Sequence, residues 1–241
     1  MELKPTEKST TLFCFSPPIM IATFIIEIIL AVYVFIKSKK AKSDLGIVLL
    51  LVFLAIFQLS EFLICGGRDP LLWSRVGLFA ITFLPVLGLY LVSKLKKDTH
   101  LLKFGIFVAI AFVIFFIFMP QTINGATCSG NYVIFDIKPN VHSLYGYYYF
   151  GFLLLGIWEA LSGIRVDKRK KMSKKALFWF IIGYLSFILP LTLVYFLIPV
   201  TRIAIASVMC GFAVIFAFIL AFKIAPVYHE CVKREIKDEK A

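Results

Sequence analysis

Long apolar stretches alternate with short polar or basic connections along the whole chain. Each stretch approaches the ~20 residues that an α-helix needs to cross a bilayer, and none has the alternating pattern of a barrel strand. Backbone groups in lipid must pair within the protein, which favours helices. The sequence therefore predicts an all-α, polytopic membrane protein with seven transmembrane helices, at about residues 17–36, 45–65, 76–95, 104–119, 143–163, 176–197 and 204–224.

The connections are too short to form a soluble domain with a core of its own, so residues 1–241 are predicted to be one domain. Residues 225–241 are expected to form a short, charged cytoplasmic tail. The longest connection, residues 121–142, contains the run YVIFDI at 132–137, which is typical of a β-strand. We expect this run to form half of a small hairpin over the mouth of the bundle.

Basic residues are distributed unevenly between the two sides of the predicted bundle. The connections after the first, third and fifth helices, together with the tail, hold 20 of the 26 lysines and arginines, and the other side holds 6. Cytoplasmic loops of membrane proteins are enriched in these residues. The pattern predicts an N-terminus outside and a C-terminus in the cytoplasm.

Composition agrees with this prediction, because 61% of the residues are hydrophobic. A net charge of +12 is also found in nucleic-acid-binding proteins. Here basic loops beside anionic lipid explain it, so we expect the lipid bilayer and no nucleic acid as a partner. The most basic loop, residues 165–175, is a candidate contact for a cytoplasmic partner. No organelle-targeting motif is visible, which favours a multi-pass protein of the plasma membrane.

The second predicted helix carries polar side chains near its outer end. Gln58, Glu61 and Cys65 are spaced i, i+3, i+7 and therefore share one helical face. A carboxylate within a bilayer is costly and usually faces the protein interior or a cavity. A second carboxylate, Glu27, lies alone in the middle of the first helix, and the sequence suggests no role for it.

Further candidates for chemistry fall at a similar height on other predicted helices. We expect a pocket in the outer leaflet that binds a small ligand, a lipid headgroup or a metal ion, with the candidate residues Cys14, Gln58, Glu61, His142, Ser207 and Cys210. The spacing is not diagnostic of a metal, because the chain has no CxxC or HExxH motif. A metal cofactor therefore stays one alternative among several.

Simpler roles are open for the same residues. Cysteine in a membrane helix often behaves as a small apolar residue, which would account for Cys210. Two outer cysteines could instead form a structural disulfide, and the loop positions favour Cys65 with Cys128. His142 could be an interfacial residue that is hydrogen-bonded to water or backbone.

Four short motifs carry a resemblance: CFS at 14–16, QLSE at 58–61, LP at 84–85 and SVMC at 207–210. With these motifs the chain resembles a family of small, uncharacterised prokaryotic multi-pass membrane proteins. It departs from that family in a longer N-terminal extension and in FLIC at 62–65, where Gly and Trp are frequent. The resemblance implies that Cys14, Glu61 and Cys210 belong to one site. The layout is also similar to the seven-helix sensory region of some histidine kinases.

Three functions fit these features. The first is a sensory or receptor-like module with an outer pocket. The second is a membrane enzyme that acts on lipid or thiol chemistry, with Glu61 as general base and Cys14 or Cys210 as nucleophile or metal ligand. The third is a small proton-coupled transporter that uses Glu27 and Glu61.

Overall fold

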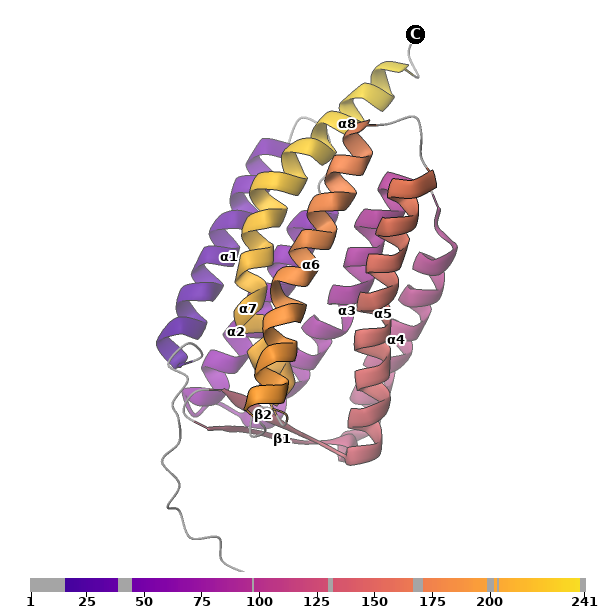
Figure 1. Cartoon of the computed structure of the whole chain (residues 1–241). Coiled ribbons are helices and arrows are strands. Elements are labelled where there is room, and N and C mark those ends of the chain that lie inside the picture. The colour runs from indigo at the N-terminus through magenta and orange to yellow at the C-terminus, as the bar shows by residue number, and fades with distance from the viewer. Residues whose placement is uncertain are drawn as a thin grey trace, which may run out of the picture.

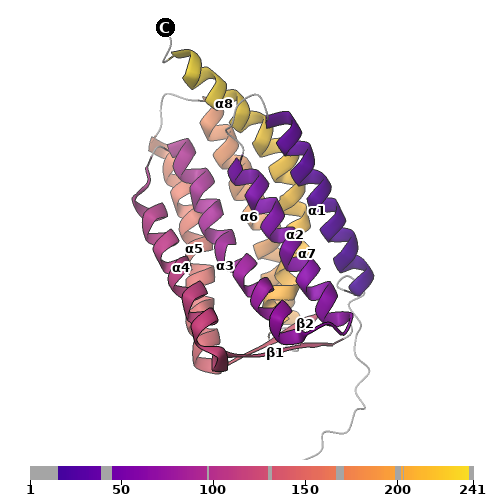
Figure 2. The same cartoon turned by 180° about the vertical axis from the view of Figure 1, so that it is seen from behind.

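The computed structural model describes residues 16–38, 45–96, 98–129, 132–166, 171–198, 202 and 204–238. They form seven helical rods that lie side by side, and the last rod consists of two consecutive helices, α7 and α8. A β-hairpin lies across one end of the bundle, which we call the hairpin end (Figure 1, Figure 2). The helices are α1 (Pro17–Ser38), α2 (Leu45–Cys65), α3 (Pro70–Lys96), α4 (His100–Phe118), α5 (Pro139–Val166), α6 (Lys171–Leu197), α7 (Ile205–Ile219) and α8 (Ala225–Asp238).

Within the described residues, six helices are long and apolar enough to cross a membrane. They are α1, α2, α3, α4, α6 and the rod that begins with α7. Helix α5 is 28 residues long but opens with the polar and tyrosine-rich sequence PNVHSLYGYYY. The fold is therefore that of a multi-pass membrane protein. Among the long helices, α5 is the one whose composition is not apolar enough to be counted among the six.

Large apolar side chains on the outer faces of the bundle are exposed. Ile29 is 60% exposed, Phe107 is 71% exposed and Phe196 is 69% exposed. A soluble domain rarely exposes so many large apolar side chains around its whole surface. Such a surface suits contact with lipid chains.

Several helices are longer than the sequence predicts, and α3 shows why. It begins at Pro70 rather than near residue 76 because Asp69 caps it. The Asp69 carboxylate accepts hydrogen bonds from the backbone N–H groups of Leu71 and Leu72, at 2.9 and 3.2 Å. Proline is well suited to the first helical turn, where its missing N–H would be unpaired in any case.

The last rod does not end near residue 224, because helix α8 continues it to Asp238. Between α7 and α8 lies one π-helical turn, η4 (Leu220–Ile224), in which the N–H of Ala225 donates to the carbonyl of Leu220. Pro226 follows directly. Proline cannot donate to the carbonyl four residues before it and its ring clashes with that carbonyl, so a wider turn accommodates it.

The hairpin confirms the strand expected at residues 132–137. Strand β1 (Ile123–Cys128) pairs antiparallel with β2 (Val133–Ile137), and a bulge between Ile123 and Gly125 shifts the register. Gly125 has φ +135°, which side chains disfavour. Phe135 of β2 packs on Phe57 of α2, with ring centroids 5.7 Å apart. The hairpin is thereby fixed to the end of the bundle.

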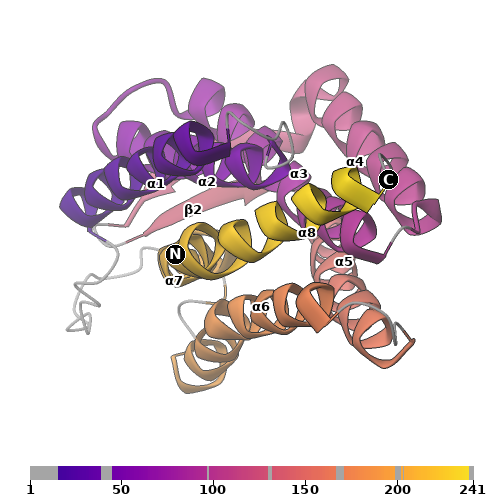
Figure 3. The same ribbon diagram turned by 90° about the horizontal axis from the view of Figure 1, so that it is seen from above.

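Viewed along the bundle, α7 lies between the α1–α2 pair and α6 (Figure 3). Helix α5 packs on α3 and α6, and α4 packs on α3. Helices α1, α2 and α7 therefore meet on one side of the bundle. Buried apolar residues from all seven rods fill the core between them.

Candidate functional site

Helix α2 directs Gln58 and Glu61 into the protein and not toward lipid. Gln58 is 2% exposed and Glu61 is 1% exposed. They are three residues apart and so occupy one face of the helix, which packs on α1 and α7. The carboxyl group of Glu61 therefore lies where side chains from these two helices can reach it.

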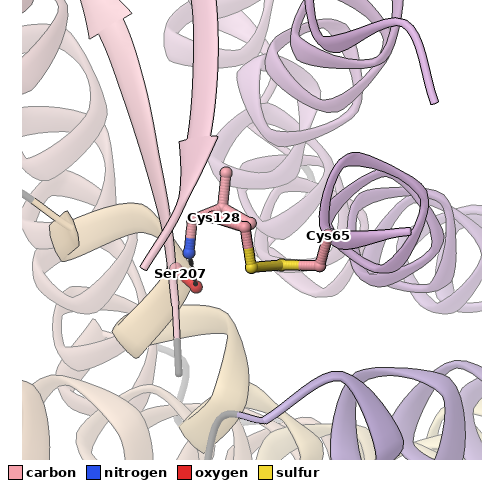
Figure 4. Close-up of a disulfide and its surroundings, with 4 residues drawn as sticks. Cys65, Cys128 and Ser207 are labelled. Carbon is pink, nitrogen blue, oxygen red and sulfur yellow. Dashed lines mark hydrogen bonds between the residues drawn. A yellow bond between two sulfur atoms is a disulfide. The ribbon is translucent and has the colours of Figure 1, made fainter. Parts of the chain in front are cut away.

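Ser207 of α7 joins this carboxyl group to the hairpin. The Ser207 side chain is hydrogen-bonded to the side chain of Glu61. Its oxygen also accepts a hydrogen bond from the backbone N–H of Val133, at 3.3 Å (Figure 4). Ser207 is 1% exposed and Val133 is fully buried. One hydroxyl thus connects α2, α7 and β2.

Glu27 of α1 belongs to the same site, which the sequence did not reveal. Its side chain is fully buried, and it is close enough to Glu61 for the two charges to interact. The thiol of Cys210 interacts electrostatically with both carboxylates. The signal in the sequence was the short connection between the first two helices, which makes them neighbours. We call Glu27, Gln58, Glu61, Ser207 and Cys210 the carboxylate cluster.

The carboxylate cluster is short of hydrogen-bond partners. Among the described residues, five buried side-chain nitrogen or oxygen atoms have no partner, and four of them belong to Glu27, Gln58 and Glu61. Both carboxylate oxygens of Glu27 are among the four, as are Nε2 of Gln58 and Oε1 of Glu61. Buried polar atoms are normally satisfied, so a concentration of exceptions is a feature of functional sites.

No basic side chain of the described residues pairs with these carboxylates. The ion pairs in this part of the chain join Lys96 to Asp98 and to Glu159. Glu159 of α5 therefore has the cationic partner that Glu27 and Glu61 lack. The difference makes Glu159 a suitable reference carboxylate in experiments.

Two of the candidate residues are not brought to the cluster. His142 is exposed in the first turns of α5, and α5 packs on α3 and α6 instead of on α2. Cys14 lies outside the described residues. Among the described residues, the carboxylate cluster draws its members from α1, α2 and α7, and the outer pocket itself stays a prediction.

Cys65 and Cys128 form a disulfide, the pairing that the loop positions favour (Figure 4). Their Cα atoms are 5.1 Å apart. The bond ties the end of α2 to the end of β1, one turn beyond Glu61. It therefore holds the hairpin over the carboxylate cluster.

Cys210 of the carboxylate cluster also lines an apolar cavity within the bundle. The cavity is lined by leucines and aromatic residues, with Tyr149 and Tyr184 as its polar members. Nucleophilic cysteines are generally activated by a cationic neighbour, whereas the charged groups that interact with Cys210 are the carboxylates of Glu27 and Glu61. The surroundings resemble those of a small core residue.

Within the described residues, no three His, Cys, Asp or Glu side chains come together in a way that could hold a metal ion. The chemistry that the cluster does offer is two carboxylates, one amide, one hydroxyl and one thiol. Oxygen-rich groups of this kind bind protons, alkali cations or protonated amines.

A comparison with protein-family models and with curated proteins finds no match for this chain. The family resemblance drawn from the four short motifs therefore stays a prediction.

Proposed function

We propose that the chain is a seven-span plasma-membrane protein, with its N-terminus outside, that binds a proton or a small cation at the carboxylate cluster and acts as a sensory or receptor-like module. The observation that carries this proposal is the burial of Glu27 and Glu61 without a cationic partner among the described residues. The binding is on the outer side, under the hairpin.

The physical argument is the cost of a buried anion. Removing a carboxylate from water without a compensating charge costs several kcal/mol in proteins, roughly the whole stability of a small domain. Two carboxylates close together repel one another and raise this cost. A proton or a small cation bound there removes half of this negative charge and the repulsion between the two carboxylates, and the unpartnered oxygens of Glu27 and Glu61 are the groups that would contact it.

Helix α5 is the proposed seventh span. With 28 residues it is about 42 Å long at 1.5 Å per residue, longer than a ~30 Å hydrocarbon core. It runs alongside the six apolar helices and packs on two of them, α3 and α6. Lys37, Lys96 and Arg165 end α1, α3 and α5 away from the hairpin end, which supports a cytoplasmic assignment of that side.

Sensing requires a path from the cluster to the other side, and the last rod offers one. Ser207 and Cys210 of α7 belong to the cluster, and the same rod continues through η4 into α8. A change of charge at Glu61 alters the hydrogen bond that holds Ser207. The rod carries that change toward the basic side, where a partner would meet α8 and the basic segment 165–175. The sequence predicts a loop over this segment, but it includes the end of α5 and the first turn of α6.

A proton-coupled transporter is the second candidate, favoured by the depths of the two carboxylates. Glu27 lies about 15 Å along α1 from its start, whereas Glu61 lies about 6 Å from the end of α2, at 1.5 Å per residue. The two carboxylates therefore lie at different depths along the membrane normal, as successive proton-binding groups of a carrier would. Below Glu27, however, α1 buries the apolar residues Leu30, Ala31 and Val34, so a carrier has to open this part of the core.

Thermal unfolding in detergent tests cation binding. The protein is titrated with sodium, potassium or methylammonium chloride, with N-methylglucamine chloride holding the ionic strength constant. We expect one of these cations, or lowered pH, to raise the melting temperature in a saturable way. Glu27→Gln and Glu61→Gln should abolish the rise, because each removes a carboxylate that contacts the bound ion.

The control is Glu159→Gln, which removes a partly exposed carboxylate near the other end of the bundle that already has Lys96 as its partner. It should leave the response intact. Equal responses in wild type, Glu27→Gln and Glu61→Gln would contradict the proposal. Reconstitution into vesicles with a pH-sensitive dye separates the two functions, because only a carrier transports protons when a cation gradient is applied.

A further inference from the structure

A second cavity, with charged residues in its lining, lies at the opposite end of the bundle from the hairpin, between α1 and the η4–α8 segment. It has a volume of about 280 Å³. Its lining includes Tyr33, Lys37, Ala221, Pro226, His229 and Glu230. We call it the α1–α8 groove. None of these residues belongs to the carboxylate cluster.

The backbone explains why the groove is open. The π-helical turn η4 and Pro226 widen the last rod at the point where it faces the end of α1. At this point the rod contributes two small residues to the groove, Ala221 of η4 and Ala225 at the start of α8. They leave unfilled the space beside Tyr33. Single π-helical turns inside longer helices are frequently found at functional sites.

The groove carries charges of both signs. Lys37 is held on its α1 side: the ammonium group donates a hydrogen bond to the Tyr33 hydroxyl and lies 4.5 Å from the centre of that ring. Glu230 lines the α8 side, next to His229. No ion pair joins Lys37 to Glu230 in the described part of the chain, although both line one groove. The two charges are therefore separated by the space of the groove.

Apolar surface continues from the groove along the membrane-facing side. Phe222 of η4 is 48% exposed and touches Tyr33, with ring centroids 5.4 Å apart. Phe35 and Ile36 of α1 are 49% and 61% exposed. A ligand that fits here has a headgroup with both charges and an apolar chain. The groove lies at the end of two membrane-spanning helices, which is the level of lipid headgroups.

We propose that the α1–α8 groove binds a phospholipid with an ethanolamine headgroup. The phosphate accepts hydrogen bonds from Lys37 and from the Tyr33 hydroxyl, and the primary ammonium donates to Glu230. The acyl chains lie along Phe222 and Phe35. A glycerol headgroup lacks the ammonium that Glu230 requires, and a choline headgroup has no N–H to donate.

Native mass spectrometry of the detergent-solubilised protein tests this site, with phosphatidylethanolamine, phosphatidylglycerol and phosphatidylcholine of identical acyl chains. We expect phosphatidylethanolamine to give the most bound lipid. Lys37→Met and Glu230→Gln should each weaken its binding by about tenfold, the usual effect of losing one charge-assisted hydrogen bond. Glu230→Gln should not weaken the binding of phosphatidylglycerol.

The chain offers a matched control in Lys94 of α3. Its ammonium lies 5.5 Å from the ring centre of Tyr90, four residues earlier, which repeats the arrangement of Tyr33 and Lys37 outside the groove. Lys94→Met should leave lipid binding unchanged. An equal loss with Lys94→Met would overturn the proposal by showing general attraction to lipid. The proposal would also be overturned if soluble phosphoethanolamine bound, with the same dependence on Lys37, while phosphatidylethanolamine did not. The ligand would then be a soluble phosphate compound and not a lipid.

Discussion

The backbone N–H of Val133 donates a hydrogen bond to the side-chain oxygen of Ser207, at 3.3 Å, across 74 positions of sequence. Val133 begins strand β2 and Ser207 lies in the first turns of α7. The same serine is hydrogen-bonded to Glu61. The hairpin is therefore coupled to the carboxylate cluster by one side chain, and loss of the Ser207 side chain should affect both the hairpin and the cluster.

Replacement of Ser207 by alanine should lower the free energy of unfolding by about 1–3 kcal/mol, because a buried N–H and a buried carboxyl group each lose a partner. Amide hydrogen exchange should also become faster at Val133. Chemical unfolding and exchange measurements check the two effects. The control is Ser186→Ala, since the Ser186 hydroxyl donates a hydrogen bond within its own helix, to the carbonyl of Gly183, at 2.6 Å. Equal effects of the two substitutions would contradict the coupling.

The disulfide between Cys65 and Cys128 should contribute strongly to stability. It closes a loop with a sequence separation of 63 residues, for which loop-closure entropy gives an upper value of about 4 kcal/mol. Reduction should therefore lower the melting temperature of the wild-type protein. The double variant Cys65→Ala/Cys128→Ala should melt at this lower temperature with or without reductant. A reductant effect that persists in the double variant would assign it to other cysteines.

The parts of this fold that could be predicted are those that depend on local pattern. Continuous apolar runs identify helices such as α2, whose bounds agree with the expected 45–65. The β-branched and aromatic run at 132–137 identifies β2. The spacing of Gln58 and Glu61 predicts that they share one face. Each of these depends on residues only a few positions apart.

The parts that could not be predicted depend on which helices are neighbours. Depth along the membrane placed His142 level with Glu61, but α5 does not pack on α2, so His142 is exposed elsewhere. The sequence suggests no partner for Glu27, because the direction in which Glu27 points depends on the rotation of α1 about its own axis. Packing against the neighbouring helices sets that rotation. Continuation of the last rod past Pro226 likewise depends on a π-helical turn that no short motif announces.

Close packing of α3 on α6 predicts that Gly88 tolerates no side chain. A Cβ atom at this position would fall on the Tyr184 hydroxyl, and Tyr184 is 1% exposed and enclosed by Phe180, Phe187 and Phe216. Gly88→Ala should destabilise the protein by about 1–3 kcal/mol, the usual cost of overpacking. Thermal unfolding in detergent measures this.

Gly151→Ala is the control for Gly88, because a Cβ atom at Gly151 meets nothing within 4 Å. It should leave stability unchanged or raise it slightly, since alanine favours a helix more than glycine does. If Gly88→Ala were equally harmless, the packing of Tyr184 against α3 would have to be looser than the structure has it.

The carboxylate cluster should make stability depend on pH. An ionised Glu27 or Glu61 is buried without a cation among the described residues, whereas in the unfolded chain it is in water. Ionisation of the pair therefore costs free energy in the folded protein and little in the unfolded chain, so the free energy of unfolding should fall as pH rises from about 5 to 8. Unfolding curves over this range measure the slope.

Substitution of Glu27 or Glu61 should reduce the dependence of the free energy of unfolding on pH. Glu27→Gln and Glu61→Gln should each flatten the curve, and the double variant should differ from the sum of the single ones, because the two charges interact. Glu159→Gln should leave the slope in place, since Glu159 is paired with Lys96. Strict additivity of the two cluster substitutions would mean that Glu27 and Glu61 titrate as separate groups, and a single bound cation between them would then be excluded.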